Sequence, residues 1–428
     1  MRIAITNGRV IDPDQGIDAE MELYIADGLI AALGAPPDGF VAERTLDARG
    51  CWVIPGAVDL AARLREPGHE HKATIASETH AAAAAGVTSL CCPPDTEPVI
   101  DTPAQVELIH RRAAAASGIH VYTLGALTTG LDGRHLSEMA ALRRAGCVGV
   151  SNALQPLAGT LVLRQAMEYA GSHGLTAHLH PVDFDLAGRG CAHEGAVASR
   201  LGLPAVPQAA ETAALGQILA LIQQTGVRTH FCRLSSARGV AMIREARRDG
   251  LPVTADVCAH QLFLTDQDLV DFNTLCHTFP PLRSEADRDA LREGLVDGTL
   301  DAVCSDHQPH EPDAKLAPFA ETIPGISALE TLLPLTMALV TGNQLSHSQA
   351  VARVTRAPAR ILGVEAGDLR PGSIADVCVF DPNERWQVRP GSLYSAGCNT
   401  PFMGRELSGR TRYTLAEGQL VFAAGEPA

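Results

Sequence analysis

Two histidines and one aspartate have the types and spacing that metal chemistry requires. His178 and His180 stand two residues apart in the apolar run LTAHLHP, and Asp306 follows another apolar run in LDAVCSDHQPH. Side chains at positions i and i+2 of a strand point to the same face, so both imidazoles could reach one ion. With the Asp306 carboxylate they would form a three-ligand site. The competing interpretation is that one histidine is a leftover ligand and the other a neighbour that is hydrogen-bonded at the strand end.

A second stretch, PGAVDLAARLREPG at residues 55–68, has the composition of a buried strand that ends in a charged loop. Barrel enzymes carry their reactive side chains at such strand ends. Here the chain has Ala61 and Arg63 instead. A methyl group cannot ligate a metal, and a guanidinium is permanently charged with no lone pair to give. This strand end therefore lacks the ligands that its position would suit.

Short β-branched or apolar runs alternate with helical patterns through the middle of the chain. Eight runs have the length and composition of strands: CWVIPGAVDL, GVTSLCCPP, IHVYTLGAL, CVGVSNA, LTAHLHP, RTHFCRL, PVTADVCAHQL and LDAVCSDHQPH. Helical patterns such as TPAQVELIHRRAAAA and ARGVAMIREARRDG lie between them. This alternation predicts a parallel (β/α)8 TIM barrel. A doubly wound sheet is the alternative, although no glycine-rich dinucleotide loop follows any of the strands.

The two ends of the chain have a different pattern. RIAITNGRVIDP and RYTLAEGQLVF both combine two apolar runs with a glycine at the turn, and GDLRPGSIADVCVFDP adds another strand. We therefore expect one small composite β-sandwich domain formed by residues 1–52 and 365–428, with the barrel over residues 53–364.

Composition excludes several classes of partner. The 428 residues are 46% hydrophobic and 19% charged, as in a globular protein, and the formal net charge is −15. Such a charge disfavours nucleic acid and anionic membrane surfaces, so neither is expected as a partner. The start of the sequence has no signal-peptide pattern, which predicts a cytoplasmic location. Eleven cysteines, mostly in apolar runs, predict buried reduced thiols.

Several motifs together resemble the dihydroorotase family, whose members are zinc enzymes of the amidohydrolase superfamily in pyrimidine biosynthesis. They are LREPG at 64–68, PPLRSEADRDAL at 280–291, SDHQPH at 305–310, PGISALET at 324–331 and NTPFMGRELSGR at 399–410. They occur in the family's order from the first strand to the last. The resemblance implies a (β/α)8 barrel with a small β-sandwich from both termini, which agrees with the pattern of runs above.

The resemblance also shows where this chain departs from the family. Aligned on these motifs, the six metal-ligand positions hold Ala61, Arg63, Ala153, His180, Arg233 and Asp306. Only His180 and Asp306 keep a ligating side chain, whereas a catalytic zinc generally needs about three protein ligands. Some relatives use a carbamylated lysine as a bridge, but the two lysines, Lys72 and Lys315, are far from the fourth strand in sequence. We therefore expect no metal cofactor.

Positions that bind substrate in the family are only partly kept. Arg65, which the resemblance implies as the carboxylate-binding residue, is present, and so is His260. Asp95 replaces an asparagine, and Phe279 replaces another. Arg65 could retain carboxylate binding or could pair structurally with Glu66 or Asp95. We treat Arg65, Asp95 and His260 as vestigial substrate-binding residues.

Asp306 is predicted to be a vestigial acid, because no metal remains to activate water for it. A buried carboxylate needs a partner, and Arg63 or Arg233 could supply the charge that the metal would have carried. We interpret the other histidines as structural. His307 and His310 are expected to form hydrogen bonds that shape a loop, and His230 is expected to be a hydrogen-bonded residue of the core or rim.

The resemblance is closest to dihydroorotase-like chains that accompany aspartate carbamoyltransferase without catalysing a reaction. It implies a structural subunit for the catalytic chain of that enzyme, with a homodimer of this chain inside a larger hetero-oligomer. Two alternatives stay open. One is an active zinc amidohydrolase, either dihydroorotase or hydantoinase-like, with an atypical metal site. The other is a sensor that binds a pyrimidine intermediate through Arg65.

Overall fold

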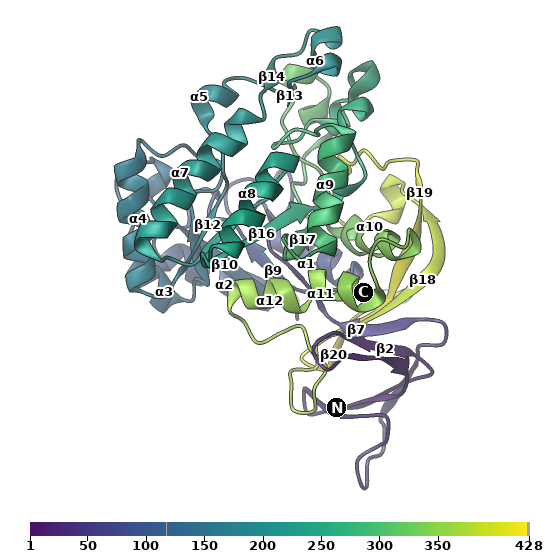
Figure 1. Ribbon diagram of the computed structural model, residues 1–428. Helices are drawn as coiled ribbons and strands as arrows, with labels where there is room; N and C mark the ends of the chain where they lie inside the picture. The colour runs from purple at the N-terminus through teal and green to yellow at the C-terminus, as the bar shows by residue number, and fades with distance from the viewer. Residues whose placement is uncertain (117, 426–428) are drawn as a thin grey trace.

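A computed structural model describes residues 1–116 and 118–425. Its centre is an eight-stranded parallel sheet that curls into a nearly closed barrel, wrapped by helices (Figure 1). Neighbouring strands pair in the order in which they occur in the chain: β8 (Ala57–Asp59), β9 (Val87–Cys92), β10 (His120–Ala126), β11 (Gly149–Ser151), β12 (Thr176–Leu179), β15 (Thr229–Phe231), β16 (Val253–Cys258) and β17 (Ala302–Cys304). The predicted TIM barrel is confirmed, and the doubly wound alternative is wrong.

The segments that follow the first and last barrel strands are hydrogen-bonded to each other. An isolated parallel bridge links Ala62 to His307, with Arg63 N donating to His307 O at 3.0 Å and His307 N donating to Ala61 O at 3.0 Å. This junction places the chain segments that follow β8 and β17 side by side. Residues of the first and eighth strand ends therefore meet at the barrel mouth.

Helices cover the outside of the barrel because their apolar faces pack on the β-branched and aliphatic side chains of the strands. The principal ones are α1 (Ile75–Ala84), α2 (Pro103–Ala116), α3 (Met139–Ala145), α4 (Thr160–Ser172), α7 (Ala209–Thr225), α8 (Ala237–Arg248), α9 (Glu285–Val296), α10 (Leu329–Thr341), α11 (His347–Val354) and α12 (Arg356–Leu362). The segment between β12 and α7 extends away from the barrel at the top of Figure 1. It contains α5 (Phe184–Ala187), β13 (Ala192–His193), α6 (Ala196–Leu201) and β14 (Ala205–Val206).

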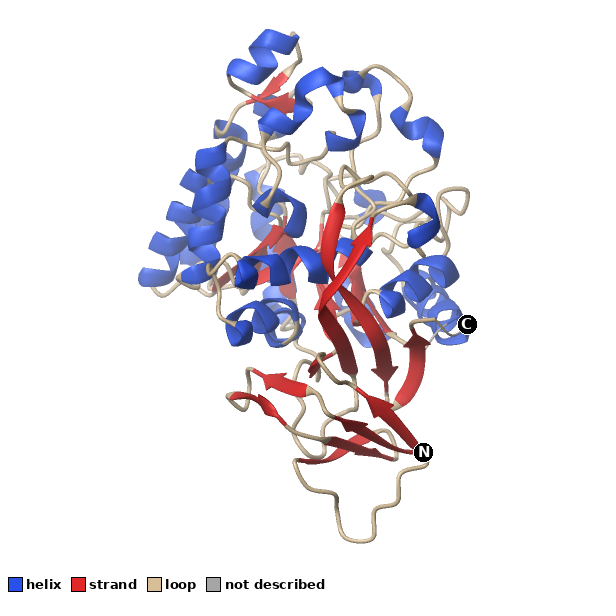
Figure 2. Cartoon of the chain, turned by 90° about the vertical axis from the view of Figure 1, so that its right-hand side faces the viewer, coloured by secondary structure: helices blue, strands red, loops and turns tan. Residues whose placement is uncertain are grey.

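Both termini build two further sheets outside the barrel, and the long strands of one of them run upward beside it (Figure 1 and Figure 2). A four-stranded sheet has the order β5-β4-β1-β6, from β1 (Arg2–Thr6), β4 (Leu23–Ala26), β5 (Leu29–Leu33) and β6 (Arg44–Asp47). A six-stranded sheet has the order β20-β19-β18-β7-β2-β3, from β2 (Arg9–Asp12), β3 (Ile17–Glu20), β7 (Trp52–Pro55), β18 (Val377–Gln387), β19 (Glu406–Ala416) and β20 (Gln419–Ala423). A separate apolar core, including Ile3, Ile25 and Val377, lies between N- and C-terminal strands.

One run that the sequence suggests as a single strand is divided between the two parts of the molecule. CWVIPGAVDL contributes β7 to the six-stranded sheet and β8 to the barrel, with Gly56 between them. A Cβ at Gly56 would lie 2.1 Å from Thr88 Oγ1, so only glycine allows the chain to pass so close to β9. The eleven cysteines, all in the described part, are free thiols, and nine are buried as predicted.

Candidate functional site

The positions singled out by the sequence gather at the carboxyl ends of the barrel strands. Arg63 follows β8, Ala153 follows β11, His180 follows β12, Arg233 follows β15 and Asp306 follows β17. Ala153, Arg233 and Asp306 have positive backbone φ angles of 49°, 57° and 47°. Non-glycine residues rarely adopt this left-handed conformation, and it is enriched at functional sites. The backbone thus has an active-site shape even where the side chains cannot ligate a metal.

Asp306 is held by two arginines at once. Its Oδ1 accepts a hydrogen bond from Arg63 Nη1 at 3.1 Å and another from Arg233 Nη1 at 2.8 Å. Gln308 Nε2 donates to Asp306 Oδ2 at 2.9 Å. The two arginines and Asp306 are each at most 5% exposed. The sequence suggested Arg63 or Arg233 as the partner, and the structure contains both pairs.

Asp95 completes this charged cluster. Arg63 Nε donates to Asp95 Oδ2 at 2.7 Å, so one guanidinium bridges two carboxylates. Burial alone would raise the pKa of Asp95, but the Arg63 charge and hydrogen bond outweigh it and lower the pKa. Likewise, burial opposes the charged form of Arg233, but the Asp306 carboxylate raises the pKa of that guanidinium. The aspartate that replaces the family's asparagine therefore has a charged partner in Arg63.

Arg65 does not pair with either of the acids that the sequence suggested, so the structural-pairing alternative is wrong, while the carboxylate-binding alternative stays untested. Its Nε donates to Pro309 O at 2.9 Å, and its Nη2 lies 3.1 Å from His310 Nε2. Glu66 instead accepts a hydrogen bond from Ile75 N and pairs with Arg112. Burial and the nearby Arg63 charge lower the pKa of Arg65 to about 10.

His180 and His260 lie beside the charged cluster as neutral rings. His180 stacks on Phe279 with ring centroids 6.2 Å apart. Burial, with the charges of Arg233 and Arg63, holds the pKa of His180 well below its usual value. Burial lowers the pKa of His260 to about 4. An imidazole facing two guanidiniums is in a poor position to help bind a divalent cation.

The residues at this site do not fit a catalytic zinc. Ala61 and Ala153 have no ligating atom, and two guanidiniums donate hydrogen bonds to Asp306 Oδ1. His180 and Asp306 are the ligands left at the six family positions. Two ligands, one of them already neutralised, fall short of the three protein ligands typical of catalytic zinc.

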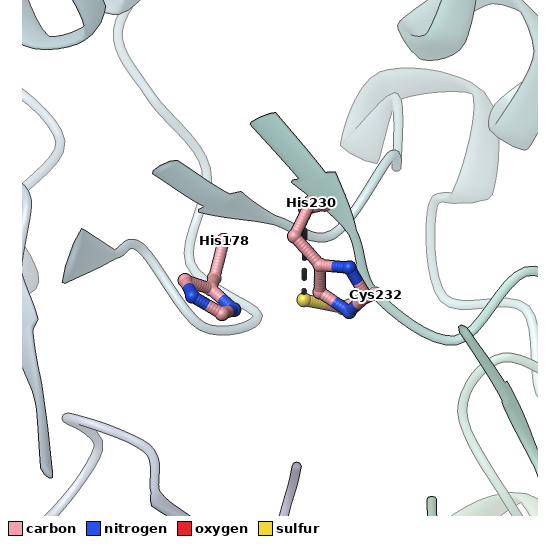
Figure 3. Close-up of side chains that lie close together, drawn as sticks. All are labelled: His178, His230 and Cys232. Carbon is pink, nitrogen blue, oxygen red and sulfur yellow. Dashed lines mark hydrogen bonds between the residues drawn. The ribbon is translucent and has the colours of Figure 1, made fainter. Parts of the chain in front are cut away.

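His178 belongs to a different group from the one that the sequence suggested. The described residues bring it together with His230 and Cys232, whose candidate ligand atoms lie within 4.8 Å of one another, rather than with His180 and Asp306 (Figure 3). Strands β12 and β15 pair with His178 in register with His230, which places both rings side by side. The relocated site of His178, His180 and Asp306 is therefore wrong. The alternation of His230 and Cys232 on one strand was the signal for this group.

The His178 group is also a poor metal site. His230 Nδ1 lies 2.9 Å from Thr254 Oγ1, and His230 Nε2 lies 3.2 Å from Asp256 Oδ2. Both ring nitrogens of His230 thus have hydrogen-bond partners, which confirms its interpretation as a satisfied core residue. Burial raises the pKa of the Cys232 thiol, which opposes the thiolate that a metal needs.

A cavity of about 320 Å³ opens beside the charged cluster, between the ends of β11 and β12 and helices α4 and α7. His180 and Ala153 form part of its wall, and Asn152, Leu179, Asp183 and Gln217 line other parts. A volume of this size is at the lower end of the range for small-molecule pockets. The cavity therefore adjoins the site only at His180 and Ala153, and none of the four charged residues of the cluster is in its wall.

Several solved hydantoinase structures share this architecture. An L-hydantoinase (dihydropyrimidinase) from Arthrobacter aurescens superposes with a TM-score of 0.88 at 24% identity, over 99% of this chain and 96% of that one. A D-hydantoinase superposes with a TM-score of 0.85 at 23% identity, over 99% and 95% of the two chains. At these identities, the likeness describes the fold.

Sequence comparison defines the family more closely. A family model described as dihydro-orotase-like matches residues 50–238. A dihydroorotase-like protein from Pseudomonas aeruginosa is 51% identical over 98% of this chain and 99% of its own length. A dihydroorotase from Geobacter sp. (strain M21) is 41% identical over 99% of this chain and all of its own length. The chain belongs to the dihydroorotase-like family. No helix within the described residues has the length and apolar character needed to cross a membrane.

Proposed function

We propose that this chain is a dihydroorotase-like protein that has lost hydrolytic activity and serves as a structural subunit for aspartate carbamoyltransferase. The observation that supports the loss of activity is the contact of both Arg63 and Arg233 with Asp306 Oδ1. Two permanently charged side chains stand where the family pattern has metal-binding histidines. The carboxylate that would serve the chemistry is thereby committed to ion pairs.

Arginines cannot replace the metal's chemical role. A zinc ion polarises the amide and lowers the pKa of its bound water from 15.7 to about 7, which generates a nucleophile at neutral pH. A guanidinium can stabilise negative charge, but it cannot ligate water or release a proton near neutral pH. Asp306 is therefore left with no activated water to deprotonate.

The preserved architecture supports a role for the fold itself. The barrel, both terminal sheets and the left-handed backbone at Ala153 and Arg233 are all present although four of the six family ligand positions have no ligating side chain. Such conformations cost of order 1–3 kcal/mol each. Their retention without a metal is expected if the shape of the barrel mouth and the surrounding loops is still used. The partner itself is inferred from the resemblance to chains that accompany aspartate carbamoyltransferase.

Metal content and turnover test the loss of activity. The full chain, purified from zinc-supplemented cultures, should contain well under one zinc per chain and should not hydrolyse dihydroorotate. The matched control is a metal-containing dihydroorotase purified and assayed in parallel. Stoichiometric zinc whose removal by a chelator abolishes hydrolysis would restore the active amidohydrolase alternative.

Co-expression with the catalytic chain of aspartate carbamoyltransferase tests the structural role. The two chains should co-elute from a sizing column well above the mass of either component, as expected of a closed hetero-oligomer. The transferase expressed alone should be smaller or less active. A fully active transferase that never co-elutes with this chain would overturn the proposed partnership while leaving the loss of hydrolysis intact.

A further inference from the structure

Two loop segments at the barrel mouth expose apolar side chains to solvent. One is η3 (Asp266–Phe272), which follows β16, and the other follows β17 and contains η5 (Pro312–Lys315) and η6 (Phe319–Glu321). Of the eleven large hydrophobic side chains that are exposed among the described residues, four lie here: Val270, Phe272, Leu316 and Ile323. Single exposed hydrophobic side chains are common on soluble proteins, but several on adjoining loops are typical of a binding surface.

Hydrogen bonds hold the two segments together. Thr274 Oγ1, just after η3, donates to Lys315 O at 2.8 Å, next to Leu316. Lys315 Nζ donates to Ile323 O at 2.7 Å, and Ile323 N donates to Ala314 O at 3.1 Å. Helix α6, at the top of Figure 1, packs against η3. The four exposed side chains are therefore carried by one continuous part of the surface, called the mouth patch below.

The backbone that carries Phe272 is strained. Asp271 and Phe272 have φ angles of 64° and 56°, in the left-handed region that residues other than glycine rarely adopt. Such a conformation costs free energy, which contacts of the side chain can offset. Phe272 is 48% exposed, so burial within this chain offsets little of that cost. An aromatic side chain kept in this position is expected if a partner covers it, because aromatic anchors contribute strongly to protein interfaces.

The exposed charges of the two segments are all acidic. Asp271, Asp313 and Glu321 are the exposed charged residues within residues 266–272 and 311–323. The single base in these ranges, Lys315, is buried, and its ammonium group donates to backbone carbonyl oxygens. The apolar side chains of the mouth patch are therefore surrounded by negative charge.

Neighbouring bases do not reverse this balance. Arg405 Nη2 lies 3.1 Å from Asp268 Oδ1, so this base neutralises an acid of η3. Lys72 Nζ lies 3.8 Å from Glu311 Oε2 and likewise offsets an acid of the second segment. Arg200, on the α6 helix that packs against η3, adds one exposed base against the three exposed acids. The surroundings of the mouth patch remain negative.

This charge pattern decides between the possible occupants. In a twofold dimer formed through the mouth patch, the same acids of both copies would face one another, and like charges across an interface are unfavourable. The same acids repel an anionic membrane surface. A protein surface with apolar side chains at its centre and lysines or arginines around them complements the patch in both respects.

We propose that the mouth patch is the surface through which this chain binds the catalytic chain of aspartate carbamoyltransferase. Phe272 and Leu316 are buried against an apolar surface of that chain, and its lysines or arginines face Asp313 and Glu321. The identity of the partner rests on the function proposed above, whereas the position of the contact rests on the patch itself. Such a contact accounts for both the exposed apolar side chains and the strained backbone at Phe272.

The affinity of the full-length chain for the catalytic chain of the transferase tests this contact, measured by sedimentation velocity over a concentration series. Phe272→Asn is the sharpest variant, because asparagine tolerates the left-handed conformation better than phenylalanine does. It should weaken binding at least tenfold, while its melting temperature stays at or above that of the parent. If Phe272 were only structural, the substitution would lower the melting temperature and leave the affinity unchanged.

A second variant and a matched control address the apolar contact directly. Leu316→Ser should also weaken binding at least tenfold. Val41→Ser is the control, since Val41 is 72% exposed against 78% for Leu316 and lies in the loop between β5 and β6, and it should leave the affinity unchanged. Glu321→Lys should slow association with the transferase, and the difference from the parent should shrink as salt is added.

The outcomes separate this proposal from the proposed function. If the parent binds the transferase and the Phe272→Asn and Leu316→Ser variants bind it equally well, the mouth patch is not the contact and this proposal alone fails. If the parent does not bind the transferase, the partnership and this surface fail together. Each protein is also sedimented alone. A parent that self-associates, with a Phe272→Asn variant that does not, would assign the patch to a second copy of this chain and overturn the proposal.

Discussion

Asp306 and His307 are neighbours in the sequence, but they belong to buried polar networks of different quality. Asp306 faces the barrel mouth and is surrounded by arginines that retain open donors among the described residues. His307 points the other way, toward α1 and the segment before β19. There His307 Nε2 donates to Glu78 Oε2 at 2.7 Å, while His307 Nδ1 accepts a hydrogen bond from Ala328 N at 3.0 Å.

The Glu78 network uses every oxygen that it contains. Ser395 Oγ also donates to Glu78 Oε2 at 2.7 Å, and Ala396 N donates to Oε1 at 3.0 Å. A fully satisfied buried network rigidifies the chain and fixes one packing arrangement. A half-satisfied network is unfavourable for stability, because its unpaired buried groups have lost water without gaining a partner. The Glu78 network thus holds the loops of the barrel mouth together, whereas the Asp306 network, called the open network below, keeps buried donors without a partner among the described residues.

The largest effect is expected from breaking the satisfied network. Glu78→Ala would leave His307, Ser395 and Ala396 with buried unpaired donors, each costing about 1–3 kcal/mol. We expect the free energy of unfolding to fall by roughly 5 kcal/mol, or the protein to be insoluble. Denaturation in guanidinium chloride measures it, with Glu107→Ala on the exposed side of α2 as the control. A loss below about 1 kcal/mol would mean that water replaces the carboxylate and that the network does not hold the loops.

Substitutions in the charged cluster around Asp306 should lower the free energy of unfolding slightly less than Glu78→Ala. The number of ion pairs that each arginine forms sets the order of the losses. Removing one partner of a buried ion pair costs about 3–5 kcal/mol. Arg63→Ala should lie at the upper end because Arg63 serves both Asp95 and Asp306, and Arg233→Ala at the lower end because it serves only Asp306.

A double-mutant cycle with Asp306→Asn separates the pairs from general packing. The loss in Arg233→Ala/Asp306→Asn should be smaller than the sum of the two single losses, because the double variant leaves no unpaired charge on Asp306. Unchanged melting temperatures for both arginine variants would mean that Asp306 is solvated or protonated. The idea that arginines replace the metal's charge would then fail.

The sequence predicts the fold well because the signals for it are local and repeated. Each barrel strand is a short apolar run, and helices such as α2 and α8 begin and end within a few residues of their patterns. The division of CWVIPGAVDL into β7 and β8 was missed, because the close approach of Gly56 to Thr88 is a tertiary contact. Such contacts leave no periodic signal in the chain.

The site is predicted less completely, and the errors have a common cause. Residue types at the ligand positions reveal that Ala61 and Ala153 cannot ligate, and chemical compensation suggests arginine partners for Asp306. The partners of Arg65 could not be deduced, since Pro309 O is a backbone atom and His310 is 245 positions away in the chain. The neighbours of His178 depend on the register between β12 and β15, which individual strand patterns do not determine.

Acid pH offers a third way to distinguish the two networks, through His260 in the open one. Burial lowers the pKa of His260 from 6.5 to about 4, so between these values the unfolded chain binds one more proton than the folded chain. The contribution of neutral His260 to the free energy of unfolding is therefore fully present above pH 6.5, and it is lost as the pH decreases toward 4. The slope is up to about 1.4 kcal/mol per pH unit, or about 3 kcal/mol in total.

His260→Gln should remove that share of the acid sensitivity. Unfolding free energies measured at pH 4.5, 5.5 and 6.5 should show a shallower slope for the variant than for the parent, while His135→Gln, at an exposed histidine, should keep the parent's slope. Parallel slopes for His260→Gln and the parent would show that the open network admits protons, with the His260 ring charged in the folded state.

The smallest effect is expected where an arginine–carboxylate pair lies at the surface. Arg112 on α2 pairs with Glu66, but its side chain is 42% exposed, so solvent screens the attraction and the free arginine is well hydrated. Glu66 also keeps its hydrogen bond from Ile75 N at 2.8 Å when Arg112 is removed, so no buried group is left unpaired. Arg112→Ala should therefore cost less than about 1 kcal/mol, and that small loss should shrink further in high salt. Comparison with Arg233→Ala under identical conditions isolates the contribution of burial to an otherwise similar pair. If the Arg112→Ala loss equalled that of Arg233→Ala, burial could not explain the strength of the cluster at Asp306, and its guanidiniums would have to be hydrated like those at the surface.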